Sequence, residues 1–157
     1  MILSGVTTVG IESAYAHNAM GRCLELLAER WPSCGPGNWV QRYFGRWFGM
    51  KPKLPMPSER NPLKVVFTEK TIVYRGKPLP YVSGITLSPY EIVLRCSRAT
   101  PLSATAFTHE YVHVALKRNT GGYDEDHDTS AYWGKQWTPA ITAMINEVDA
   151  ILAEEGY

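Results

Sequence analysis

Residues 100–119 read TPLSATAFTHEYVHVALKRN, and this stretch decides the fold of the 157-residue chain. A helix is predicted here because Thr100 can cap its N-terminus and Pro101 suits its first turn. Gly121 and Gly122 follow the stretch and are typical of a helix end. Apolar residues occupy two neighbouring faces of the predicted helix, so we expect it to be buried among other elements.

The predicted helix contains the pattern H-E-x-x-H, at His109, Glu110 and His113. Two histidines four residues apart share one helix face, so their imidazoles can bind one Zn²⁺ together. Zinc would lower the pKa of a bound water, and Glu110 would polarise that water. The pattern therefore predicts one zinc ion per chain, with Glu110 as the catalytic base.

Three residues beyond this helix are candidates for the third protein ligand that a catalytic zinc needs. We prefer His127, because the glycines before it can turn the chain back toward the metal. Its acidic neighbours can also orient the imidazole through its second ring nitrogen. Asp128 is an alternative ligand, and Glu147 on the predicted last helix is another.

Four short segments before the helix predict β-strands, because they are rich in β-branched residues and bounded by turn residues. They span residues 64–67, 71–75, 81–87 and 90–95. Gly76 and Lys77, between the second and third segments, favour a hairpin turn. Helical periodicity is present over about 11–31, again from Trp39, and over 139–155 after Pro139. Residues 49–63 contain four prolines and are predicted to form a connecting loop.

These segments together predict a single α+β domain over residues 1–157. A short mixed or antiparallel sheet is expected to pack on the H-E-x-x-H helix, within a unit of residues 64–133. A helical N-terminal part, residues 1–50, and a C-terminal helix, residues 139–155, complete the expected domain.

The composition is that of an ordinary soluble globular protein, with 45% hydrophobic and 20% charged residues. No apolar run is long enough for a transmembrane helix. Three cysteines without C-x-x-C spacing argue against a disulfide framework and favour a cytoplasmic protein. The net charge of +1 combines +6 in residues 1–80 with −5 in residues 81–157. The opposite charges of the two halves are consistent with two faces of one domain that attract each other. They are also consistent with a basic surface that binds a substrate or partner, next to an acidic half that binds a cation.

Strands followed by a helix with His109-Glu110-x-x-His113 resemble the zincin metallopeptidases. A third histidine soon after the helix, followed by an aromatic residue, is similar to the SprT-like group, and the match covers roughly residues 64–133. The chain departs from that group because Asp128 replaces its usual glycine and because Tyr132 comes later than its aromatic residue. A minimal gluzincin would instead use Glu147, although Ile151 stands where the gluzincin pattern has Asp.

This resemblance implies a zinc-dependent hydrolase that cleaves peptide bonds in a protein or peptide substrate. In the implied mechanism Glu110 takes the water's proton and passes it to the leaving amine. A phenol helps to stabilise the oxyanion, and Tyr123 and Tyr132 are the candidates. The resemblance also implies an edge strand, expected within residues 86–94, that aligns an extended substrate by main-chain pairing. The alternative is a zincin-derived structural metal-binding protein, or a nucleic-acid-associated protein without peptidase activity. The aromatic and basic segment 39–53 favours nucleic acid as a partner, although its aromatic stripe is also typical of a buried helix face.

Overall fold

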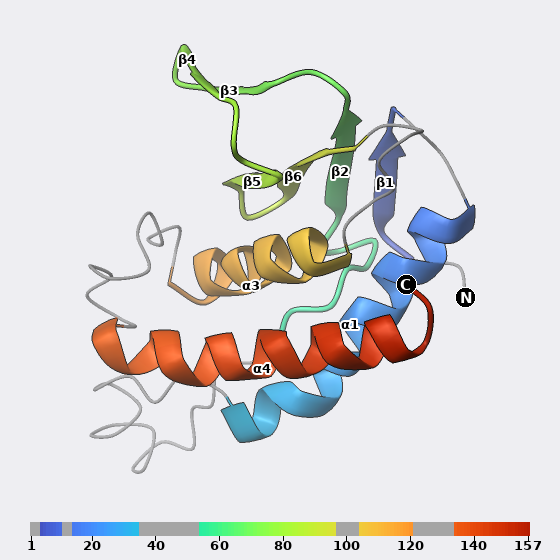
Figure 1. Cartoon of the computed structure of the whole chain (residues 1–157), viewed down its shortest axis with the longest axis vertical. Helices are drawn as coiled ribbons and strands as arrows, with labels where there is room; N and C mark the ends of the chain where they lie inside the picture. Colours follow the sequence, from blue (N-terminus) through green and yellow to red (C-terminus); the bar gives the residue numbers. More distant parts are fainter. Residues whose placement is uncertain (1–3, 11–13, 35–53, 97–103, 121–133) are drawn as a thin grey trace.

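The computed structural model describes residues 4–10, 14–34, 54–96, 104–120 and 134–157. These residues form three helices, a mixed four-stranded sheet and a two-stranded sheet, an α+β arrangement (Figure 1). The strands are β1 (Val6–Val9), β2 (Leu63–Thr68), β3 (Ile72–Tyr74), β4 (Lys77–Leu79), β5 (Gly84–Ser88) and β6 (Glu91–Arg95). The helices are α1 (Ala14–Cys34), α3 (Ala104–Thr120) and α4 (Gly134–Glu154). The aromatic and basic segment 39–53 lies outside the described residues.

The main sheet has the strand order β1-β2-β6-β5, which places β5 at one edge. Strands β1 and β6 run parallel to β2, whereas β5 runs antiparallel to β6. The sheet is therefore mixed, which is one of the two predicted arrangements. The prediction of an edge strand within residues 86–94 is only partly right. Strand β5 lies at an edge of the sheet, but β6 lies between β2 and β5. Ile92 and Leu94 of β6 are fully buried, as expected for a strand with neighbours on both sides.

Strand β1 is not among the predicted strands, although Val6-Thr7-Thr8-Val9 is rich in β-branched residues. It pairs with β2, more than fifty residues later in the chain, so its ladder depends on the tertiary fold. Gly5 precedes it at φ +77°, and its main-chain oxygen accepts a hydrogen bond from Leu63 N at 2.8 Å. A Cβ on Gly5 would lie 2.2 Å from the main-chain carbon of Ser58, so only glycine fits this crossing.

Strands β3 and β4 form a small hairpin that projects beyond β5 in Figure 1. Its two-residue turn consists of Arg75 and Gly76, both with positive φ, between the paired residues Tyr74 and Lys77. Two positive φ values are characteristic of a type I′ turn. The predicted turn is thus confirmed to within one residue, but the third predicted strand is not its partner. That segment instead enters the main sheet as β5, because the tight turn brings Lys77–Leu79 back onto β3 first.

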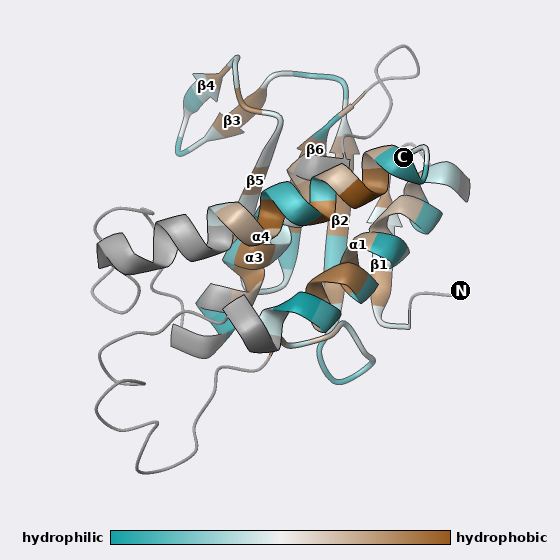
Figure 2. Cartoon of the chain, turned by 60° about the horizontal axis from the view of Figure 1, so that its bottom comes forward, coloured by the Kyte–Doolittle hydropathy of each residue, from teal (hydrophilic) through white to brown (hydrophobic). Residues whose placement is uncertain are grey.

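Helix α3 lies between the sheet and the pair of helices α1 and α4 (Figure 1). This position confirms the prediction of a buried helix, and its two apolar faces have separate partners. Brown and teal segments alternate along α1 and the C-terminal part of α4, as expected for helices with one buried face (Figure 2). The core contains Met20, Leu24 and Leu27 of α1, Leu63 and Val65 of β2, Phe107, Tyr111 and Val114 of α3, and Met144, Val148 and Leu152 of α4.

Both terminal helices extend past the prolines that border their predicted ranges, about 11–31 and 139–155. Helix α1 continues through Pro32 to Cys34, and α4 begins at Gly134, before Pro139. A proline removes one intrahelical hydrogen bond without forbidding a helix, and packing of the other residues offsets that local cost. None of the described helices combines the length and the apolar character needed to span a membrane.

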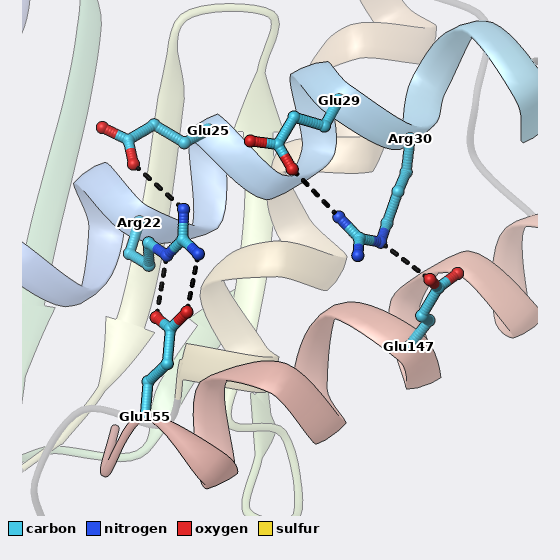
Figure 3. Close-up of polar contacts among 6 residues, drawn as sticks. All are labelled: Arg22, Glu25, Glu29, Arg30, Glu147 and Glu155. Carbon is cyan, nitrogen blue, oxygen red and sulfur yellow. Dashed lines mark hydrogen bonds and ion pairs between the residues drawn. The ribbon is translucent and has the colours of Figure 1, made fainter.

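Two ion pairs join α1 to α4 on the outside of the molecule (Figure 3). The Arg22 guanidinium donates to both carboxylate oxygens of Glu155, over 2.7 and 2.6 Å. Arg30 Nε lies 3.0 Å from Glu147 Oε1. Exposed ion pairs contribute little net stability because both partners are well solvated when apart. Their main effect here is to fix how α4 lies along α1.

Candidate metal centre

His109 and His113 face each other from successive turns of α3. Their Nε2 atoms are 3.2 Å apart, their ring centroids are 4.9 Å apart, and the ring planes are inclined at 67°. Both residues are partly exposed. At this distance one neutral imidazole can donate to the other, or both lone pairs can point at a single cation.

The spacing of the two nitrogens fits a shared zinc ion. Zinc–nitrogen bonds are about 2.0–2.1 Å long. Two nitrogens 3.2 Å apart would therefore subtend an angle of roughly 100–106° at a common ion, close to the tetrahedral value. Imidazole is also a ligand that zinc prefers. The histidine pair could thus supply two of the ligands of a tetrahedral site with little rearrangement.

Glu110 points away from solvent, toward the edge strand β5. Only 8% of its surface is exposed, and its Oε2 atom lies 2.7 Å from Thr86 Oγ1. The same Thr86 hydroxyl lies 2.8 Å from the main-chain oxygen of Glu110. Hydrogen bonding is essential at this position because a buried carboxylate without it would be strongly destabilising. The side chain that the sequence predicts as the base is therefore held in a defined position by β5.

Gly84 provides the space that the Glu110 side chain occupies. A Cβ at Gly84 would lie 2.8 Å from Glu110 Cγ and 2.9 Å from Leu94 Cδ2, closer than real carbon contacts allow. No sequence pattern predicted a role for Gly84, and Thr86 was expected only as part of the edge region. A glycine within a strand pattern is a signal of close approach, but the pattern alone does not identify the approaching group.

The opposite side of α3 is fixed by contacts with the rest of the core. Thr108 is fully buried and hydrogen-bonds the Cys23 thiol of α1. Burial raises the pKa of Cys23 to about 12, so this thiol stays neutral. The Tyr111 hydroxyl donates to the Pro55 carbonyl, and burial raises the pKa of this phenol as well. These contacts restrict rotation of the helix and hence the direction of its histidines.

Arg118, in the last turn of α3, connects the helix to the ends of two strands. Its guanidinium donates to the carbonyl of Pro89, over 2.7 Å, and to the carbonyl of Pro62, over 3.0 Å. Its Cζ atom also lies 5.0 Å from the centre of the Tyr90 ring. Because Pro89 and Tyr90 form the turn between β5 and β6, Arg118 holds the edge hairpin against α3.

The other predicted site residues are placed as follows. His127, Asp128, Tyr123 and Tyr132 lie outside the described residues. Glu147 is exposed and its carboxylate is paired with Arg30 of α1 (Figure 3). Within the described parts of the chain, no group of three or more His, Cys, Asp or Glu side chains could hold a metal ion. The structure therefore brings His109 and His113 together, directs Glu110 of the same helix toward Thr86, and does not bring Glu147 to the histidines.

Comparison of the chain with models of known families, with curated proteins and with solved structures gave no match.

Proposed function

We propose that the protein is a zinc-dependent metallopeptidase in which His109, His113 and His127 hold the metal and Glu110 is the general base. The observation that carries this proposal is the pair of Nε2 atoms 3.2 Å apart, on a helix whose next residue after His109 is a buried, hydrogen-bonded glutamate. A metal site with a purely structural role does not need such a carboxylate. His127 remains the preferred third ligand because the carboxylate of Glu147, the alternative on α4, is paired with Arg30.

Zinc, when bound, supplies a Lewis acid that activates water for attack at neutral pH. His109 and His113 orient it through two imidazole nitrogens on one helix face. Glu110 accepts the proton of the attacking water at its carboxylate and delivers it to the nitrogen of the leaving amine. Tyr123 and Tyr132 are proposed to donate to the oxyanion of the substrate.

The open edge of β5 supports a peptide as the substrate. Arg95 N donates to Ser83 O over 2.7 Å, and hydrogen-bonded pairs alternate along an antiparallel ladder. Hence Ile85 bonds to β6, whereas the main-chain groups of Gly84 and Thr86 point away from it. No described strand pairs with that side of β5. An extended peptide can therefore add to this edge through main-chain hydrogen bonds, next to Glu110.

Metal content and proteolysis, measured on the same samples, test this proposal. Wild-type protein is expected to contain about one zinc by mass spectrometry and to cleave fluorescein-labelled casein. E110Q is expected to keep the zinc and to lose cleavage, because the amide cannot accept the proton. E147Q serves as the control, since the carboxylate it alters is the one that pairs with Arg30. A fully active, zinc-loaded E110Q protein would refute the assigned role of Glu110.

A cytoplasmic location is part of the same proposal. Cys96 is a free thiol buried in the described core, and buried free thiols are usual in reducing compartments. Nucleic acid is a second candidate partner, through segment 39–53. Steep loss of binding to single-stranded DNA with added salt would support that role.

A further inference from the structure

Thr86 occupies an unusual position relative to Glu110, because one hydroxyl contacts both the side chain and the main chain of the same residue. The Oγ1 atom lies 2.7 Å from Glu110 Oε2 and 2.8 Å from Glu110 O. Only 9% of Thr86 and 8% of Glu110 is exposed, so solvent has little access to these contacts. The hydroxyl thus fixes the carboxylate relative to its own helix and relative to β5.

Gly84, on the same strand as Thr86, also restricts the position of the Glu110 side chain. Residues two apart in a strand point to the same face, so the Gly84 and Thr86 positions both face α3. The Glu110 side chain passes over Gly84, where no side chain would fit, and ends at the Thr86 hydroxyl. Steric and polar contacts from a single strand segment therefore determine the direction of the carboxylate.

We propose that Thr86 is a positioning residue that sets the Glu110 carboxylate relative to a peptide bound at the β5 edge. The main-chain groups of Thr86 face the open edge, while its hydroxyl holds Glu110. A peptide hydrogen-bonded to this edge is thus aligned by the same residue that aligns the base. This inference rests on the proposed peptidase function.

The ladder between β5 and β6 becomes irregular immediately after Thr86. Thr86 pairs with Ile92 and Ser88 pairs with Glu91, which makes Leu87 an extra residue in β5. Such a bulge bends the strand and redirects neighbouring side chains. Regular pairing before the bulge keeps Gly84 and Thr86 in register with β6.

The substitution T86V keeps the branched shape of the side chain and removes its hydroxyl, whereas T86S keeps the hydroxyl. The first test is a double-mutant cycle in metal-free protein, with T86V, E110A and the double variant unfolded in urea. T86V is expected to lower the urea midpoint more in the wild-type background than in the E110A background. Equal shifts in both backgrounds would overturn the inference, because the hydroxyl would then not act on the Glu110 side chain.

The second test uses zinc-loaded protein and labelled casein at several concentrations. T86V is expected to lower kcat roughly tenfold or more, since small misplacement of a reacting group is costly. Its KM and zinc content should stay at the wild-type values, and T86S should restore most of kcat. T7V is the matched control, because Thr7 is an exposed threonine on the opposite edge strand.

The outcomes separate the two proposals. A T86V protein with wild-type kcat overturns the role of Thr86 and leaves the peptidase proposal standing. Loss of zinc from T86V also overturns it, because the residue would then support the metal instead of the base. Zinc-loaded wild-type protein that does not cleave casein contradicts the peptidase proposal, and with it this inference, whatever the result of the metal-free cycle.

Discussion

Replacing Gly84 by alanine is the most direct perturbation of the candidate site that leaves its polar groups unchanged. The added methyl would lie 2.8 Å from Glu110 Cγ and 2.9 Å from Leu94 Cδ2. Gly84 is not among the described glycines with positive φ, so the effect of the substitution is steric and involves no backbone strain. The variant therefore tests whether the space above β5 is needed for Glu110.

The expected size of the effect follows from these two distances. Carbon atoms in good contact are about 3.5–4.0 Å apart, so Glu110 and Leu94 both have to move away from the added methyl by roughly 1 Å. Overpacking of this kind costs about 1–3 kcal/mol of stability. A displacement of about 1 Å at a reacting group lowers the rate by up to ~100-fold. G84A should therefore be less stable and far less active, with zinc still bound by the histidines.

Urea unfolding, zinc content and casein cleavage measure the three quantities. The midpoint of unfolding should fall by roughly 1 M in urea for a loss of this size. G76A is the control, because Gly76 has φ +77° and no atom within 4 Å of its missing Cβ. It should lose about 1 kcal/mol through backbone strain alone, with cleavage unchanged. A G84A protein as stable and as active as wild type would refute the close packing of Glu110 on β5.

Three further predictions concern the metal, the edge hairpin and pH. H113A should lose most of its zinc, measured by mass spectrometry, because one of the two facing nitrogens is removed; retention of one full equivalent would contradict the metal site. R118A should lose about 1–2 kcal/mol in urea unfolding, since its hydrogen bonds to Pro62 and Pro89 disappear; unchanged stability would show that Arg118 does not hold the hairpin. Burial raises the pKa of Cys23 from 9.0 to about 12. The stability that the neutral thiol contributes to the folded protein is therefore complete below pH 9 and is lost as the pH rises from 9 toward 12. C23A should therefore show a shallower loss of stability between pH 9 and 10.5 than wild type, and equal slopes would exclude this linkage.

Local patterns predicted the elements that depend on nearby residues. The apolar periodicity and the flanking glycines predicted the helix that carries His109 and His113, and the structure has it at Ala104–Thr120. Gly76 similarly predicted the hairpin turn, because a positive φ is a property of one or two residues. The boundaries at Pro32 and Pro139 were wrong, since a proline weakens a helix locally and tertiary packing decides whether the helix continues.

Strand partners were the main part of the fold that the sequence left open. The parallel ladder between β1 and β2 joins residues that are far apart in the chain. The period of two in a strand shows which side chains share a face but does not name the neighbouring strand. For that reason β1 was missed, and the interior strand β6 was included in the expected edge.

The sequence by itself determined that His109 and His113 face each other, because helical geometry places residues four apart on one face. It also identified Glu110 as the acid beside them. Only the tertiary structure decided where that acid points, since Thr86 lies 24 residues away on a different element. The physical reason is that a helix sets the spacing of its own side chains, whereas the environment of a buried carboxylate is supplied by whatever packs against the helix.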